Sequence, residues 1–266
     1  MTVIREPCVA GQFYPGDAGE LSSTLRTLLS DAPHNDDGPP PKALIVPHAG
    51  YQYSGPVAAA AYARLVPYRD RYTRVVLLGP CHRMPLRGLA LSTCDAFRTP
   101  AGLVPLDTET IARLRSPGVL PFEESHEYEH SIEVHLPFLQ AILSSFSIVP
   151  IVVGDADPES IANVIDAVWG STETLIVVSS DLSHYLSYED ARRTDAMTCR
   201  EIENLSSSHI FSDDACGARP IGGLLLAARR HHLHVETLDL RNSGDTTGKR
   251  DLPVVGYGAW LFSGDE

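Results

Sequence analysis

Short apolar runs without polar alternation recur along the chain and set its expected architecture. They read ALIV, VVLLG, LALS, SIVPIVVG and LIVVSS, and they occupy residues 43–46, 75–79, 89–92, 147–154 and 175–180. Together the runs are rich in β-branched residues, and none alternates between apolar and polar positions as a strand with one exposed face would. The runs therefore predict strands that are buried on both faces.

Helix-length segments separate several of these runs. We expect helices at residues 18–30, 55–65, 107–115, 158–169 and 220–230. Strands that alternate with helices indicate a mainly parallel or mixed central sheet with helices packed over it. The stretches at residues 234–240 and 254–262 predict further strands, with an antiparallel arrangement as one option. We therefore predict a single α/β domain over residues 1–266, built as an αβα sandwich.

Composition narrows the functional classes. The 266 residues are 43% hydrophobic and 21% charged, with a formal net charge of −13, which disfavours nucleic-acid partners in the absence of a basic patch. The sequence has neither an apolar run long enough to cross a bilayer nor a basic-then-apolar leader, so we expect a soluble cytoplasmic protein without a membrane partner. Five scattered cysteines without a C-x-x-C pair favour reduced thiols over disulfides or a zinc ribbon.

Three of the predicted strands run directly into loops that carry histidine. The first of these loops, PHAGY, contains His48, and the second, PCHR, contains His82. The third, DLSHY, contains Asp181 and His184. In open α/β sheets, ligands bind in the crevice beyond the carboxyl ends of the strands. One such histidine often only bonds a backbone carbonyl, but several together predict a shared site.

Residues 125–139 read SHEYEHSIEVHLPFL and contain the H-E-x-x-H pattern of zinc metalloproteases. That pattern requires both histidines on one face of a helix and a third ligand downstream. The preceding stretch is acidic and no third-ligand motif follows, so we reject a metalloprotease. We expect Glu127 and Glu129 in a solvated acidic loop. A helix should follow, with apolar residues at helical spacing: Ile132, Leu136, Leu139 and Leu143.

Several blocks of the sequence resemble one protein family. They include VAGQFYP, VPHAGYQYSG, LLGPCHR, EHSIEVHLPFLQ, SSDLSHY and CGARPIGGLL, at residues 9–15, 46–55, 77–83, 129–140, 179–185 and 216–225. In this order they are similar to the Memo family, whose prokaryotic members are called AmmeMemoRadiSam system protein B. The blocks span nearly the full length of the chain.

The resemblance implies a fold similar to that of the class III extradiol dioxygenases, which are non-haem iron enzymes. It also implies a metal position of two histidines and one cysteine, which correspond here to His48, His82 and Cys216. The name of the prokaryotic members implies a radical-SAM protein as a partner. Further residues in matching motifs are implied to line the same crevice: His130, Glu133, His135, Asp181 and His184.

A thiolate in place of a carboxylate would soften the metal site. We expect iron(II) or copper as the cofactor, with zinc as a further candidate. Cys216 precedes an apolar helix whose N-terminus would lower the thiol pKa, although a free cysteine is commonly a buried apolar side chain. Cys81, next to His82, is a candidate for an additional ligand or redox partner.

The other polar residues are candidates for supporting roles. Asp181 and Glu133 are expected to accept hydrogen bonds from the ligand imidazoles. Together with Asp181, His135 and His184 are the expected catalytic groups, because imidazoles titrate near neutrality, with structural hydrogen bonding as their alternative. Tyr51 is expected to line the crevice or to pack beside it.

Three functions stay open at this point. The first is a metal-dependent redox enzyme acting on an unidentified small molecule. The second is an extradiol dioxygenase acting on a catechol, which cysteine at the carboxylate position disfavours. The third is a binding module for a peptide or another protein. Neither a G-x-S-x-G elbow nor a nucleotide-binding glycine motif occurs in the sequence.

Overall fold

The computed structural model describes residues 2–33 and 38–264. Its centre is a mixed sheet of nine strands. The order is β10 (His184–Leu186), β12 (Val254–Ser263), β2 (Ala43–Val46), β9 (Thr174–Ser179), β3 (Arg74–Pro80), β8 (Ser147–Val153), β4 (Leu89–Leu91) and β7 (Val119–Pro121), with β11 (His234–Asn242) paired to β12. The predicted strands are therefore present, and the C-terminal pair is antiparallel.

The middle of the sheet is parallel. Strands β2, β9, β3 and β8 lie side by side in the same direction, while β12 and β4 flank them in the opposite direction. Every residue of β2 and of β9 is buried. This confirms that the uninterrupted apolar runs form strands covered on both faces.

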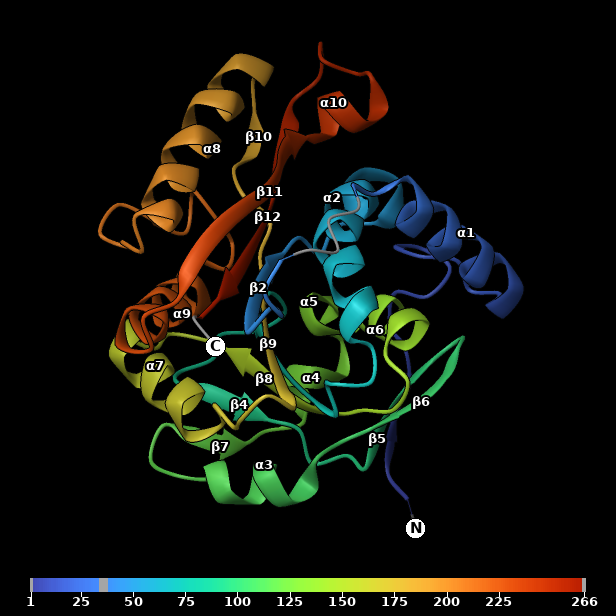
Figure 1. The fold of residues 1–266 in the computed structure, drawn as a ribbon, viewed down its shortest axis with the longest axis vertical. Helices are drawn as coiled ribbons and strands as arrows, with labels where there is room; N and C mark the ends of the chain where they lie inside the picture. The colour runs from blue at the N-terminus through green and yellow to red at the C-terminus, as the bar shows by residue number, and fades with distance from the viewer. Residues whose placement is uncertain (1, 34–37, 265–266) are drawn as a thin grey trace.

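Helices cover both faces of the sheet (Figure 1). One face carries α1 (Ala18–Asp31), α2 (Tyr51–Tyr62), α5 (His130–Glu133) and α6 (Leu136–Ile142), and the other carries α7 (Pro158–Ala167), α8 (Tyr188–Glu203) and α9 (Ala218–Arg230). The shorter helical segments are η1 (Ala63–Tyr68), α3 (Thr108–Leu114), α4 (Glu124–Glu127) and α10 (Ser243–Thr247). This arrangement confirms the predicted α/β sandwich.

A small second sheet joins the N-terminus to the middle of the chain. It consists of β1 (Ile4–Arg5), β5 (Ala96–Thr99) and β6 (Gly102–Pro105), in that order. Strand β1 pairs in parallel with β5 and holds the side chain of Arg5 in the interior, where only 5% of the residue is exposed. The sequence did not predict this sheet, because two- and four-residue strands leave little hydrophobic pattern.

Helix α8 was also not predicted. Its buried positions are occupied largely by small or polar residues, namely Ala191, Asp195, Thr198, Cys199 and Ile202. A search for apolar residues at helical spacing therefore finds little in this segment. Within the described residues, every helix is too short or too polar to cross a lipid bilayer.

Candidate metal centre

Three neighbouring parallel strands deliver polar side chains to one edge of the sheet. Strand β9 lies between β2 and β3, so the carboxyl ends of all three meet at that edge. His48 and His82 each lie two residues beyond the end of their strand, β2 and β3, and Asp181 lies two residues beyond the end of β9. Parallel pairing thus brings together loops that are far apart in the sequence.

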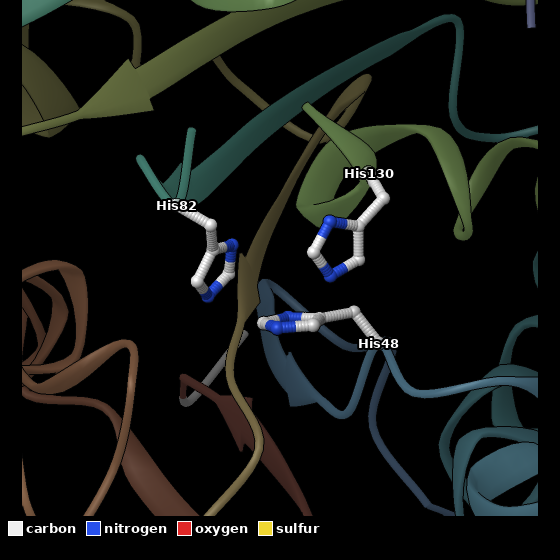
Figure 2. A group of neighbouring side chains, drawn as sticks. All are labelled: His48, His82 and His130. Atoms are coloured by element: carbon white, nitrogen blue, oxygen red, sulfur yellow. The ribbon is translucent and has the colours of Figure 1, made fainter. Parts of the chain in front are cut away.

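Three imidazoles converge there: His48, His82 and His130 (Figure 2). Each offers one nitrogen, and the three nitrogens lie within 4.8 Å of one another. The ring centroid of His48 lies 5.2 Å from that of His82 and 5.4 Å from that of His130, and the centroids of His82 and His130 are 4.8 Å apart. Imidazole nitrogens at this spacing can bind a single transition-metal ion.

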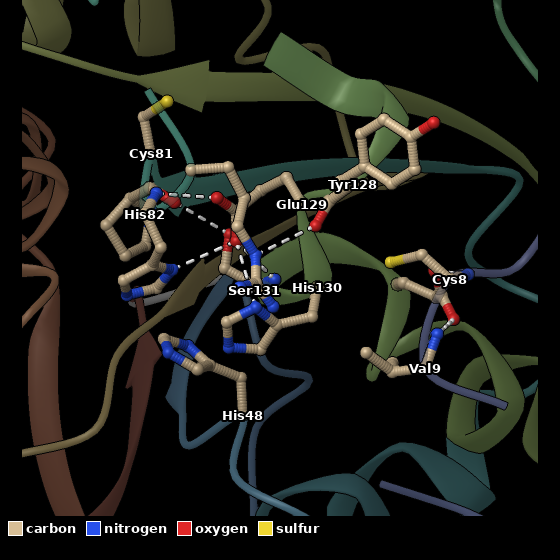
Figure 3. Close-up of polar contacts among 12 residues, drawn as sticks. Cys8, Val9, His48, Cys81, His82, Tyr128, Glu129, His130 and Ser131 are labelled. Carbon is tan, nitrogen blue, oxygen red and sulfur yellow. Dashed lines mark hydrogen bonds and ion pairs between the residues drawn. The ribbon is translucent and has the colours of Figure 1, made fainter. Parts of the chain in front are cut away.

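The orientation of His82 is fixed by Glu129 (Figure 3). One carboxylate oxygen lies 2.9 Å from Nδ1 of His82, and the other accepts the His82 backbone N–H at 2.6 Å. Burial raises the pKa of this carboxyl, but the hydrogen bonds from His82 and Ser131 prevail and lower it to about 2. Glu129 is therefore an ionised acceptor, and Nε2 of His82 is left free for a ligand.

This position of Glu129 corrects one expectation. Only 2% of Glu129 is exposed, so it does not belong to a solvated acidic loop, whereas Glu127 is exposed as expected. The hydrophobic positions around it behave as predicted, because Ile132, Leu136, Leu139 and Leu143 are all buried. They do so across two short helices, α5 and α6, rather than one.

A chain of hydrogen bonds fixes the tautomer of His48. The hydroxyl of Ser179 donates to the backbone carbonyl of Ser131 at 2.5 Å. The Ser179 oxygen lies 2.6 Å from Nδ1 of His48, and its only proton is already used, so Nδ1 must be the donor. The lone pair of His48 is therefore on Nε2, the nitrogen available to a metal ion.

Burial favours the neutral, ligating form of these imidazoles. It lowers the pKa of His48 well below its ordinary value, and the neighbouring imidazoles lower it further. Burial also lowers the pKa of His130 to about 4, against the opposing charge of Glu129. Both rings are uncharged at neutral pH, so a metal ion would displace no proton from either nitrogen.

A buried ion pair holds the segment that carries Glu129 and His130. Arg5 donates to a carboxylate oxygen of Glu133 at 2.5 Å, and to the backbone carbonyls of His126 and Glu129, both at 2.8 Å. Glu133 also accepts the backbone N–H groups of Cys8 and Val9 and the hydroxyl of Tyr14. The Glu133 carboxylate therefore accepts hydrogen bonds from Arg5 and the N-terminal segment, and not from the imidazoles of the cluster, as had been expected.

The same segment explains why the H-E-x-x-H match misleads. Helix α4 ends at Glu127 and α5 begins at His130, so the two histidines of the motif do not share one helix face. The ring of His126 is buried and bonds the backbone carbonyl of Ala90 at 3.1 Å. Only His130 reaches the imidazole cluster, in accord with the rejection of a metalloprotease.

Cys216 lies beside His48 but outside the group of three imidazoles. Its sulfur is 3.5 Å from Nε2 of His48, and it accepts the backbone N–H of Asp181 at 3.3 Å. The thiol precedes α9, as expected, but its pKa is not lowered. Burial and the nearby carboxyl of Asp181 raise the pKa of Cys216 to about 12, because both disfavour a thiolate. In the absence of a cation this residue is a neutral thiol.

Comparison with known proteins identifies the family. The family model described as Memo-like protein matches residues 5–261. The chain belongs to the Memo family. Relatives named MEMO1 family protein are 37% identical in Aquifex aeolicus, over 97% of this chain and 99% of the relative, and 35% identical in Methanopyrus kandleri, over 97% and 98%. The predicted family resemblance is thereby confirmed.

A solved structure shares the fold at low sequence identity. The crystal structure of an uncharacterized protein from Escherichia coli K12 aligns with a TM-score of 0.55 and 12% identity. The alignment covers 84% of this chain and 99% of the other. At this identity the likeness speaks for the α/β fold alone.

Some residues of the Memo-type motifs do not take part in the imidazole cluster. His135 is buried, bonds the hydroxyl of Tyr62 at 2.8 Å, and has a pKa lowered by burial to about 3. Tyr51 is also buried and donates to the carbonyl of Val134. The sulfur of Cys81 points away from the imidazoles and bonds the carbonyl of Met84 (Figure 3).

Asp181 and His184, by contrast, line a cavity together with His130. Asp181 accepts the backbone N–H of His48 at 2.8 Å, rather than a ring nitrogen of that residue. Burial raises the pKa of Asp181 to about 6 and lowers the pKa of His184. The hydrogen-bond acceptors of the His48 and His82 rings, Ser179 and Glu129, were not predicted. The SSDLSHY and EHSIEVH blocks contain both residues, but the sequence does not show which side chains they meet.

Proposed function

We propose that this Memo-family chain binds a single redox-active metal ion, iron(II) or copper, with His48 and His82 as two of its ligands. The observation that carries the proposal is the fixed tautomer of both rings. Ser179 and Glu129 occupy the Nδ1 side of each imidazole, which leaves Nε2 of His82 free and Nε2 of His48 facing the sulfur of Cys216. Supporting groups of this kind orient the histidine ligands of metal proteins and increase their basicity.

The third ligand in this proposal is the thiolate of Cys216, with His130 as the alternative. Its sulfur is 3.5 Å from Nε2 of His48. A small rotation of the Cys216 side chain would therefore allow the sulfur and Nε2 to bind the same ion. A thiolate favours copper(I) or zinc while still permitting iron, whereas three imidazoles suit zinc, copper and iron alike. The identity of the third ligand therefore bears on the identity of the metal.

The neighbouring side chains suit proton transfer near such an ion. A bound metal of this type would supply redox chemistry or polarise a substrate oxygen. His184 is half-buried in the adjoining cavity, and its lowered pKa keeps it neutral and able to accept a proton at neutral pH. Asp181 has a pKa of about 6, so it can exchange a proton near neutrality.

Metal analysis tests the proposal directly. The protein would be treated with a chelator, reconstituted anaerobically with Fe(II), Cu(I) or Zn(II), and desalted before the metal is counted. We expect about one ion of iron or copper per chain, and a loss of stoichiometric binding in H48A and H82A. H209A is the control, because the His209 side chain is 77% exposed and pairs with Glu201, away from the imidazole cluster. If the chain retains no ion under any of these conditions, the proposal is wrong.

X-ray absorption of the loaded protein separates the two choices of third ligand. A Cys216 thiolate would add a sulfur scatterer, and C216S would remove it while H130Q would not. Three imidazoles would give only light scatterers, and H130Q would then weaken binding more than C216S. This comparison identifies the ligand without an assay of activity.

Two other functions have their own tests. Oxygen uptake in the presence of catechols would indicate an extradiol dioxygenase. If a thiolate occupies the carboxylate position, we expect no oxygen uptake in this assay. A peptide- or protein-binding role, including one with a radical-SAM protein, would show affinity that is unchanged by chelators.

A further inference from the structure

A cavity of about 740 Å³ adjoins the imidazole cluster. His130, Asp181 and His184 form part of its wall. The volume falls within the range of pockets that enclose a small organic molecule. A ligand held here would lie next to the cluster.

Four aromatic residues contribute to the wall of this cavity: Phe13, Tyr53, Tyr185 and Tyr257. The ring of Phe13 meets His130 edge-on at 5.0 Å, and the ring of Tyr185 meets His184 at 5.9 Å. Aromatic faces and edges of this kind favour a planar ring as ligand. Among the described residues, the three phenol hydroxyls have no hydrogen-bond partner, so they remain available to the ligand.

The wall contains one acidic and one basic side chain, Asp181 and Lys249. Asp181 already accepts the backbone N–H groups of His48 and Ala49, at 2.8 and 3.3 Å. Lys249 is the other residue of the wall that ordinarily carries a full charge, and its ammonium group has no ion-pair partner among the described residues. In a chain with a net charge of −13, a lysine without an ion-pair partner among the described residues thus lines this cavity. A single ammonium group matches a monoanion better than a phosphate, which proteins usually bind with several donors.

Tyr185 has an unusual backbone conformation in the same wall. Its φ angle is +58°, in the left-handed region that bulky residues seldom adopt, and the residue is 76% exposed. Neither hydrophobic burial nor a local hydrogen bond of its hydroxyl accounts for a large aromatic side chain in this place. Strained backbone of this kind concentrates at ligand-binding sites.

We propose that this cavity binds a small aromatic carboxylate, whose ring packs against Tyr185 and Tyr53 and whose carboxylate pairs with Lys249. The inference builds on the metal centre proposed above, since it names the class of molecule presented to that centre. The binding contacts themselves belong to the protein and do not include the metal.

Titration calorimetry with four matched probes tests the class of ligand. The probes are 2-naphthoate, its neutral isostere 2-naphthamide, the non-aromatic cyclohexanecarboxylate, and the dianion 2-naphthyl phosphate. We expect 2-naphthoate to bind about fivefold more tightly than the amide, the upper range for an ion pair open to solvent. It should also bind more tightly than the other two. Equal affinity for acid and amide, or a preference for the phosphate or the non-aromatic acid, would overturn the proposal.

Two variants assign the contacts. K249Q should reduce 2-naphthoate affinity about fivefold and leave 2-naphthamide affinity unchanged. R250Q is the matched control, because it removes the same charge from the next residue, which bonds Asp245 and does not line the cavity. Y185G should weaken the binding of both aromatic probes while the thermal midpoint stays close to that of the wild type, since glycine tolerates this φ angle. An effect of R250Q equal to that of K249Q, or none of Y185G, would contradict the assignment.

The same titrations in chelator-treated and metal-loaded protein separate the two proposals. Binding of 2-naphthoate by protein that retains no metal would support the cavity and reject the metal centre. Stoichiometric metal without any binding of 2-naphthoate would do the reverse.

Discussion

The two flanks of the imidazole cluster differ in how they are held. On one side, which we call the charged flank, Glu129 bonds the ring of His82, while Arg5 and Glu133 hold the segment that carries His130. On the other, the thiol flank, Cys216 and Asp181 surround His48 without any cationic side chain in a hydrogen bond to either. The carboxylates of the charged flank are therefore satisfied by protein donors, whereas Nδ1 of His130 is buried without a hydrogen-bond partner among the described residues. The thiol flank requires an external cation to stabilise a thiolate.

Removing a carboxylate from the charged flank should have the largest effect on stability. E133A would leave Arg5 buried without its counter-ion, and breaking a buried pair in this way costs about 3–5 kcal/mol. Urea denaturation measures this loss. E6A is the matched control, because it breaks the exposed Arg98–Glu6 pair and should cost less than about 1 kcal/mol. Similar losses in both variants would mean that the buried pair is not what holds this flank.

Neutralising Glu129 tests whether the charged flank serves the metal site. E129Q keeps the shape of the side chain but weakens its bond to Nδ1 of His82, and loss of such an outer acceptor lowers metal affinity about 10- to 100-fold. A chromophoric chelator in competition with the protein would measure the affinity. S179A makes the corresponding change at His48, on the other flank. Wild-type affinity in E129Q would remove Glu129 from the metal centre.

The pH dependence of metal affinity tests the thiol flank. The Cys216 thiol has a pKa of about 12, so a metal ion that binds its thiolate must release one proton at neutral pH. Affinity should then rise about tenfold per pH unit between pH 7 and 9, and C216S should abolish this rise. If His130 is the ligand instead, its pKa of about 4 predicts no such rise in the same range.

Acidification should also lower the stability of the metal-free protein. The pKa values of His130 and His135 are lowered to about 4 and 3, so the folded state binds fewer protons than the unfolded state below about pH 6.5. Stability should fall on acidification by roughly 1 kcal/mol per pH unit for each proton taken up. H130Q should make this fall shallower.

Asp181 should act in the opposite direction. Its pKa is raised to about 6, so between pH 4 and 6 the folded state binds more protons at this group than the unfolded state does. D181N should therefore make the acid-induced loss of stability steeper. A shallower loss in D181N, measured by urea denaturation across this range, would contradict the assignment.

The sequence predicts the histidines of the cluster better than the residues that hold them. The loops that carry His48 and His82 follow strands whose apolar runs are unmistakable, so their convergence at one sheet edge could be expected. The burial of Glu129 could not be predicted in the same way. Its neighbours in the sequence are acidic, and its burial depends on His82, which lies 47 residues away.

Arg5 illustrates the same limit from the other end of the chain. It lies in a two-residue strand, and its partner Glu133 is 128 residues away in sequence. Hydrophobic periodicity identifies buried apolar faces, but it carries no information about which buried charges pair. Cys216 shows a further difficulty, because its position before α9 was predicted correctly, whereas the expected lowering of its thiol pKa by the helix was wrong and burial raises the pKa instead.

The bond from Ser179 to the Ser131 carbonyl has a consequence for metal choice. Both residues are buried, Ser179 in strand β9 and Ser131 in helix α5, so we expect them to keep His48 in one orientation whether or not an ion is bound. Two imidazoles that are already oriented, His48 and His82, can bind several divalent and monovalent transition-metal ions with little rearrangement. Discrimination among them would then follow from the softness of the remaining donor and from the supply of each ion in the cell.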